Sequence, residues 1–150
     1  PVQPAKGYSV TTRRPDRCPQ IPFMLVEAKI AATPMGDKLR FAGTLELAGM
    51  DLSINRRRVA ALMKAVPEYV PAWGQGALEL VEVWRGLRPC SPDGLPYIGR
   101  AGAYDNLTVA AGHAMIGVSL GPVTGAVTAR IVQGEESGFD MSLCDVDRYN

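Results

Sequence analysis

The chain has 150 residues, which is enough for one domain with a buried core. Its 16 Lys and Arg residues nearly balance 15 Asp and Glu residues, which excludes a protein that holds nucleic acid through its overall charge. A hydrophobic fraction of 47% excludes a disordered chain, and no apolar run approaches the roughly 20 residues of a membrane span, so the expected partner is a small molecule.

The first part of the chain predicts strands. β-Branched and aromatic residues favour a strand over 8–12, and the basic, turn-forming residues 13–20 indicate a loop. Two largely apolar segments, 22–32 and 39–47, flank a turn in which Gly36 can take a positive φ. Together these two segments predict an antiparallel hairpin.

A helix is predicted over residues 56–66. Asn55 is a suitable N-cap, apolar residues recur at helical spacing, and Pro67 is expected to end the helix. The three arginines at 56–58 either bind an anion or form a solvated face, and as basic residues at a helix N-terminus they oppose its dipole.

The second half alternates strands, a long loop and a helix. Residues 77–84 predict a strand, and the Gly- and Pro-rich residues 85–99 predict a long ordered loop of the kind on which function often lies. A short buried strand is expected at 106–111, and a helix at about 118–133 has Gly134 placed at its C-terminal cap.

This order of elements predicts an α+β fold, a mostly antiparallel sheet packed by a few helices, with an extended and peripheral tail ending at Asn150. The odd number of widely spaced cysteines, Cys18, Cys90 and Cys144, argues against a zinc site and against a disulfide framework, and it favours a reducing, cytoplasmic compartment. Because the chain opens on Pro1 without a Met, it is expected to begin inside a longer protein.

The turn between the last strand and the last helix is the first candidate site. Gly112 and Gly117 bound it, and the first N–H groups of the following helix have no partner within the helix, so they favour an electron-rich ligand. Glycine also allows a flat ligand to approach the backbone closely. The alternative is that these glycines only permit a tight turn and close packing.

Two side chains are further candidates. Arg88 can bind a carboxylate through its planar guanidinium group, or it can pair internally with Asp93. His113, the single histidine, is either an acid or base or a hydrogen-bonded structural residue. The sequence contains no phosphate-binding loop, zinc-protease motif or nucleophile elbow, which removes the main support for hydrolases and nucleoside triphosphatases.

Three segments taken together resemble the C-terminal half of the flavin oxidoreductases that include bacterial D-amino-acid dehydrogenases and glycine oxidases. They are Pro4–Ser9 (PAKGYS), Trp84–Gly99 (WRGLRPCSPDGLPYIG) and Asn106–Gly117. Their order and spacing also match the family, so the resemblance extends over nearly the whole chain. The resemblance implies residues 1–97 in a substrate-binding lobe. It also implies a strand, turn and helix within residues 98–150 that complete an FAD-binding lobe otherwise absent from the chain.

The resemblance also implies roles for individual residues. Arg88 would bind the substrate carboxylate and Tyr8 would lie near the substrate pocket. The turn would contact FAD through Gly112, His113, Ala114, Met115, Ile116, Gly117 and Val118. Two departures from the family's pattern concern the substrate. Glycine oxidases have a second arginine where this chain has Met115, and Arg85 stands where the relatives usually have a small or neutral residue.

The family's N-terminal strand, glycine-rich turn and helix are missing here, so the chain is expected to be an inactive fragment. Its intact parent would be a cytoplasmic or peripheral inner-membrane enzyme that oxidises a D-amino acid or related amine by hydride transfer to FAD. Two alternatives are one subunit of a split flavoenzyme and a stand-alone amino-acid-binding module. A third is a fragment whose uncovered apolar surface drives self-association.

Overall fold

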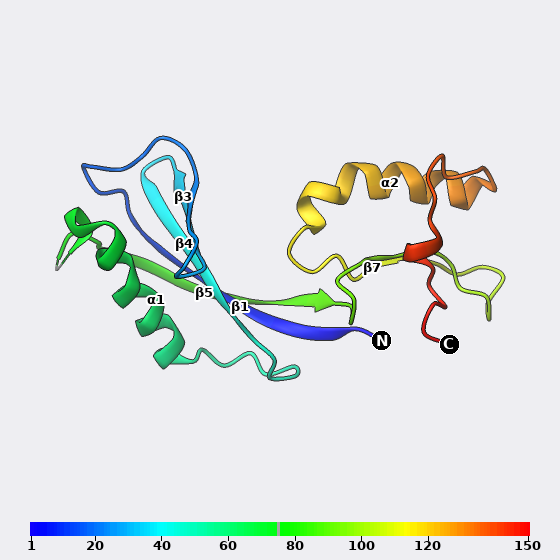
Figure 1. Ribbon diagram of the computed structural model, residues 1–150, viewed down its shortest axis with the longest axis horizontal. Helices are drawn as coiled ribbons and strands as arrows, with labels where there is room; N and C mark the ends of the chain where they lie inside the picture. The colour runs from blue at the N-terminus through cyan, green and yellow to red at the C-terminus, as the bar shows by residue number, and fades with distance from the viewer. Residues whose placement is uncertain (75) are drawn as a thin grey trace. The chain divides into compact units, whose positions relative to one another are not determined.

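The computed structural model describes residues 1–74 and 76–150 and divides into two compact units (Figure 1). The sheet unit comprises Lys6–Leu87, and the turn unit comprises Pro1–Ala5 together with Arg88–Asn150. Their elements form an α+β fold with antiparallel strand pairing, as the order of predicted elements indicated. The division at residue 97 concerns the lobes of a longer enzyme and stays a prediction.

A five-stranded sheet organises the sheet unit. Its strands lie in the spatial order β2-β3-β4-β1-β5. Strand β1 lies between β4 and β5, and its residues from Ala5 to Thr12 are all buried. The bounds are β1 (Gln3–Arg13), β2 (Phe23–Leu25), β3 (Ile30–Met35), β4 (Lys38–Glu46) and β5 (Leu80–Cys90).

The predicted hairpin is confirmed in part. Gly36 has φ +62° in the turn that joins β3 to β4. The prediction of one strand over 22–32 was wrong, because the chain reverses between β2 and β3 so that Leu25 pairs with Ile30. Lys29 permits this reversal with φ +55°, a conformation that a lysine rarely adopts and that the sequence therefore does not indicate.

Helix α1 (Arg56–Tyr69) begins where it was expected. The Asn55 side chain accepts hydrogen bonds from the backbone N–H groups of Arg57 and Arg58 at 3.1 and 3.4 Å. The prediction that Pro67 ends the helix was wrong, since the helix continues to Tyr69. Proline removes a single N–H donor so close to the end, and the last turn is still closed by the Val70 N–H on the Val66 carbonyl.

The core of the sheet unit lies between the sheet and α1. Trp73, in the short 3-10 helix η1 (Pro71–Trp73), is 1% exposed, and its indole N–H donates to the Arg17 carbonyl at 2.9 Å. The ring centres of Phe23 and Phe41 lie 6.0 and 5.8 Å from the ring centre of Trp73. The other buried apolar residues of this core are Val10, Leu25, Ile30, Ala32, Leu39, Leu62 and Val66.

The turn unit contains a two-stranded sheet and a long helix. Strands β6 (Tyr97–Arg100) and β7 (Thr108–Ala111) pair antiparallel, and α2 (Gly117–Gln133) follows and ends at Gly134 with φ +79°. The prediction of a continuous loop over 85–99 was wrong, because β5 runs on to Cys90 and β6 begins at Tyr97. The Gly and Pro residues give this stretch the composition of a loop, although both of its ends form strands.

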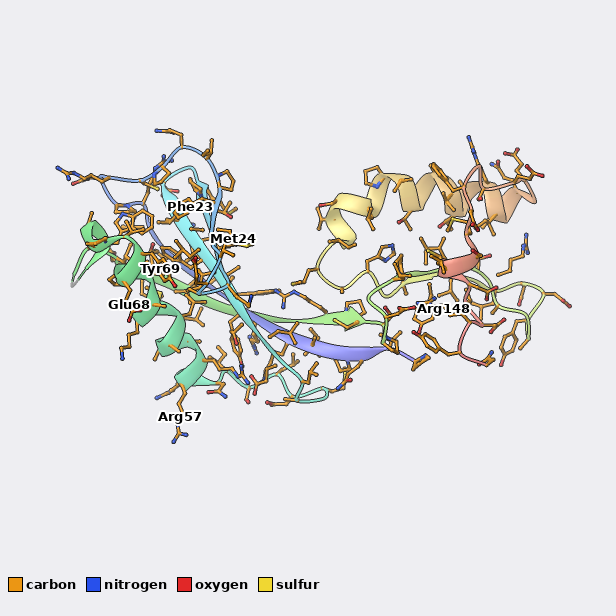
Figure 2. The ribbon with its side chains drawn as sticks, in the orientation of Figure 1. Phe23, Met24, Arg57, Glu68, Tyr69 and Arg148 are labelled. Atoms are coloured by element: carbon orange, nitrogen blue, oxygen red, sulfur yellow. The ribbon has the colours of Figure 1, made fainter. Side chains whose placement is uncertain are left out.

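The tail is more ordered than the sequence indicated. The prediction that it is extended and peripheral was wrong, since it contains the 3-10 helix η2 (Ser142–Cys144), and the Arg148 side chain is only 12% exposed. The guanidinium group of Arg148 lies 3.8 Å from the centre of the Tyr97 ring. The C-terminal residues are therefore part of the packing of the turn unit, where Figure 2 labels Arg148.

Candidate functional site

Arg88 is half-buried, and one nitrogen of its guanidinium group lacks an acceptor among the described residues. It lies near the end of β5, and its Nη1 atom is buried without a hydrogen-bond partner anywhere in residues 1–74 and 76–150. The internal pairing of Arg88 with Asp93 is not found, because the Asp93 carboxylate accepts from Arg148 at 2.9 and 3.1 Å. Since a buried donor without an acceptor is costly, this guanidinium group is suited to a carboxylate ligand.

The glycine-bounded turn is attached to the strand that carries Arg88. The Ala114 N–H donates to the Pro89 carbonyl at 3.0 Å, and Cys90 and His113 form an antiparallel bridge. Both contacts lie within the turn unit. They fix the turn and the residues next to Arg88 in one register, so a ligand on the turn and a carboxylate on Arg88 would be held at a defined separation.

The backbone of the turn requires special conformations. Gly112 has φ +82°, and a Cβ atom there would lie 3.0 Å from Cδ2 of the Tyr97 ring. Ala114 has φ +48° although it is not glycine. A Cβ atom on Gly117 would lie 3.2 Å from the Cβ of His113. Gly112 thus provides the backbone conformation, and both glycines allow close packing. Close packing was the alternative to a ligand role, and it does not exclude that role.

The start of α2 presents free donors beside apolar side chains. Among the described residues, no side chain caps this helix, and the first intrahelical bond runs from the Leu120 N–H to the Ile116 carbonyl. The N–H groups of the preceding first turn are therefore available to a ligand. Met115, Ile116 and Val118 are 73%, 48% and 96% exposed. This arrangement suits a flat, largely apolar ligand with an electron-rich edge.

His113 has a structural partner. Its Nε2 atom lies 3.0 Å from the hydroxyl of Thr124 on α2. This bond links the turn to the second turn of the helix, which favours the structural alternative for the imidazole ring and leaves the backbone of the turn for ligand contact.

Tyr8 belongs to a polar cluster inside the sheet unit. It is 1% exposed, its hydroxyl donates to Glu46 at 2.7 Å, and the same hydroxyl accepts from the Asn55 N–H at 3.2 Å. The hydrogen bond from Tyr8 holds the pKa of Glu46 below its usual range. Because its hydroxyl already has two partners, Tyr8 joins the end of β4 to the start of α1, and its role in substrate binding stays a prediction.

A buried lysine completes this cluster and was missed in the sequence. Lys6 is fully buried, and its Nζ donates to Asp51 at 2.8 Å and to the Ser53 carbonyl at 2.9 Å. The hydrogen bond to Asp51 raises the pKa of Lys6, and the same bond lowers the pKa of Asp51. A lysine inside a strand of buried residues was the one signal that could have pointed to this pair.

The three arginines at the start of α1 behave differently from one another. Arg58 donates to the Thr44 hydroxyl at 2.9 Å and lies 3.5 Å from Glu46. Arg56 and Arg57 are exposed, and Figure 2 shows the Arg57 side chain extending away from the helix. The first two therefore form a solvated face, and the third belongs to the polar cluster.

Residues 1–74 and 76–150 show neither a membrane-spanning helix nor a metal-binding cluster. Neither helix there combines the length and apolar character that crossing a membrane requires. No group of three His, Cys, Asp or Glu side chains in that part of the chain is arranged to hold a metal ion.

Residues 1–131 match the family model described as FAD dependent oxidoreductase. The D-amino acid dehydrogenase of Xanthobacter autotrophicus is 38% identical over 99% of the chain, and that of Chromohalobacter salexigens is 36% identical over 99%. The chain spans about a third of the length of these relatives, 35% in both cases.

Solved structures of two oxidases have the same fold as this chain. Glycine oxidase from Geobacillus kaustophilus superposes on 99% of the chain with a TM-score of 0.90 and 31% identity, and the match covers 40% of that protein. Iminodiacetate oxidase from Chelativorans superposes on 97% of the chain with a TM-score of 0.86 at 23% identity, which is a likeness of fold alone.

Proposed function

The chain belongs to the family of FAD-dependent oxidoreductases, and we propose that within its intact protein it binds an amino-acid substrate through Arg88 beside the cofactor. The intact protein would oxidise a D-amino acid or a related amine, the activity for which its similar relatives are named. Because the chain spans about a third of those relatives, this activity is proposed for the whole protein.

The observation that carries the proposal is the buried Nη1 atom of Arg88, which has no partner among the described residues. A substrate carboxylate would supply the missing acceptor and a matching charge. Arg88 would then fix the substrate by one end and orient its α-carbon, a contribution of positioning rather than of proton transfer.

The turn and the start of α2 fit FAD as the family's cofactor. Their exposed apolar side chains suit a flat ring system, and the free N–H groups suit a ring edge on which negative charge gathers. The residues that would contact it are Gly112, His113, Ala114, Met115, Ile116, Gly117 and Val118. When bound, FAD supplies the acceptor for the hydride that leaves the α-carbon of the amine.

We further propose that residues 1–97 serve the substrate lobe and residues 98–150 serve the cofactor lobe of the intact protein. Tyr8 would support the substrate pocket by fixing the segments that its hydroxyl joins, since both of its hydrogen-bond partners lie within the sheet unit. The bond between Ala114 and Pro89 would keep the two ligands in register.

Kinetics of the full-length protein test the role of Arg88. Replacing Arg88 with Lys keeps the charge but removes the planar pair of donors, so the KM for D-alanine should rise about tenfold or more, because a hydrogen bond to a charged group contributes about 1.5–3 kcal/mol. Arg57→Lys is the matched control, since Arg57 is exposed at the start of α1 and belongs to the solvated face of that helix. Equal KM values for the two variants would remove Arg88 from the site.

The 150-residue chain by itself should be colourless and inactive, because the relatives are about three times as long. An absorbance scan between about 350 and 500 nm and a dehydrogenase assay check this expectation. Micromolar binding of D-alanine by the isolated chain without flavin, measured by calorimetry, would instead favour a stand-alone amino-acid-binding module.

A further inference from the structure

The connection between β5 and β6 is held by one residue from the far end of the chain. Arg148 donates from Nε to Asp93 Oδ2 at 2.9 Å and from Nη2 to Asp93 Oδ1 at 3.1 Å. Nη2 also donates to the Leu95 carbonyl at 2.8 Å. Because the guanidinium group also lies over the Tyr97 ring, Arg148 is fixed on both its edge and its face.

Both carboxylate oxygens of Asp93 accept hydrogen bonds. Besides the two bonds from Arg148, its Oδ1 accepts from the Leu95 N–H at 3.0 Å. The Arg148 guanidinium group holds the pKa of Asp93 well below its usual range, so Asp93 is an anion at neutral pH. Bidentate pairing of this kind is among the strongest contacts that a carboxylate makes.

Arg88 lies on the same stretch of chain, separated from Asp93 by only four residues. Its buried Nη1 has no acceptor in the described part of the chain, so it would gain from any carboxylate within reach. Asp93 is the carboxylate nearest to Arg88 in sequence, and a connection this short allows the two side chains to meet once the connection is released.

We propose that Arg148 is a positioning residue for substrate binding: by engaging Asp93, it prevents that carboxylate from occupying Arg88 and so leaves Arg88 available to the substrate. This inference rests on the proposed function of Arg88. It assigns to the C-terminal segment an effect on substrate affinity, exerted through the charge of Asp93.

Kinetics of the full-length protein test the proposal with three variants. Arg148→Met removes the guanidinium group, and the KM for D-alanine and the dissociation constant of benzoate, a non-reactive carboxylate measured by calorimetry, should both rise about tenfold while kcat changes less than about twofold. Adding Asp93→Asn to Arg148→Met should restore both constants to within about twofold of the parent, because no carboxylate remains to compete. Asp93→Asn alone should change KM less than about twofold.

The rescue separates the proposal from a purely structural role. If the double variant binds D-alanine and benzoate as weakly as Arg148→Met, the effect of Arg148 does not pass through Asp93 and the proposal fails. An unchanged KM in Arg148→Met overturns it equally. Arg88→Lys, measured in parallel, distinguishes the two failures: a raised KM there with no effect of Arg148→Met leaves the proposed function standing and removes only this inference.

Discussion

Substituting Gly112 with Ala places a side chain where the turn has no room for one. The new Cβ would lie 3.0 Å from Cδ2 of Tyr97. That ring cannot move aside cheaply, because its hydroxyl donates to the Pro1 carbonyl at 2.8 Å and the Arg148 guanidinium group lies 3.8 Å from its centre. Gly134 is the matched control, since it has nearly the same φ, +79° against +82°, and nothing within 4 Å of its Cβ position.

The magnitudes follow from these two environments. An alanine in the left-handed region costs about 1–2 kcal/mol, offset by about 0.4–1 kcal/mol from the stiffer unfolded chain, so Gly134→Ala should lower the free energy of unfolding by about 1 kcal/mol. Gly112→Ala adds the cost of overpacking against a fixed ring, about 1–3 kcal/mol. It should therefore destabilise the protein by about 2–4 kcal/mol in total.

Urea unfolding followed by circular dichroism measures both free energies on the same protein. Gly112→Ala should unfold at clearly lower urea than Gly134→Ala, with a gap of at least about 1 kcal/mol. Equal destabilisation of the two variants would mean that Tyr97 yields freely, and the close packing of the turn would then not explain Gly112.

Trp73→Ala should lower the free energy of unfolding by about 3–5 kcal/mol in the same urea assay, since Trp73 is 1% exposed. Trp84→Ala, at a residue that is 53% exposed, should cost far less, and equal costs would refute the assigned core. Asp93, whose pKa is lowered by Arg148, stabilises the fold above its unfolded pKa of about 3.9 and loses that contribution as the pH falls through its lower folded pKa. The stability difference between the parent and Asp93→Asn should thus be constant at neutral pH and vanish in acid, and a difference that grows in acid would refute the ion pair.

Local signals in the sequence predicted the elements with clear boundaries. Asn55 and Gly134 mark the start of α1 and the end of α2 because capping depends on one residue and its nearest neighbours. Gly36 marked its turn for the same reason. The turn at Lys29 was missed because a lysine there gives no signal of a positive φ.

The site was predicted only as far as short motifs reach. Arg88 and the glycine-bounded turn lie in continuous segments that can be recognised directly. The partners of Arg148 and Lys6 cannot be recognised in this way, since Asp93 lies 55 residues from Arg148 and Asp51 lies 45 residues from Lys6. Ion pairs between distant residues follow no periodicity, so the sequence left open whether Arg88 pairs with Asp93, and the fold shows that Asp93 pairs with Arg148 instead.

A crystal structure of the full-length protein with FAD and benzoate tests the central claim most directly. The benzoate carboxylate should accept hydrogen bonds of about 2.7–2.9 Å from the Arg88 guanidinium group. The first-turn N–H groups of α2 should face the flavin ring, with Asp93 still paired to Arg148. A carboxylate bound elsewhere, with Arg88 paired to Asp93, would contradict both the proposed function and the role of Arg148.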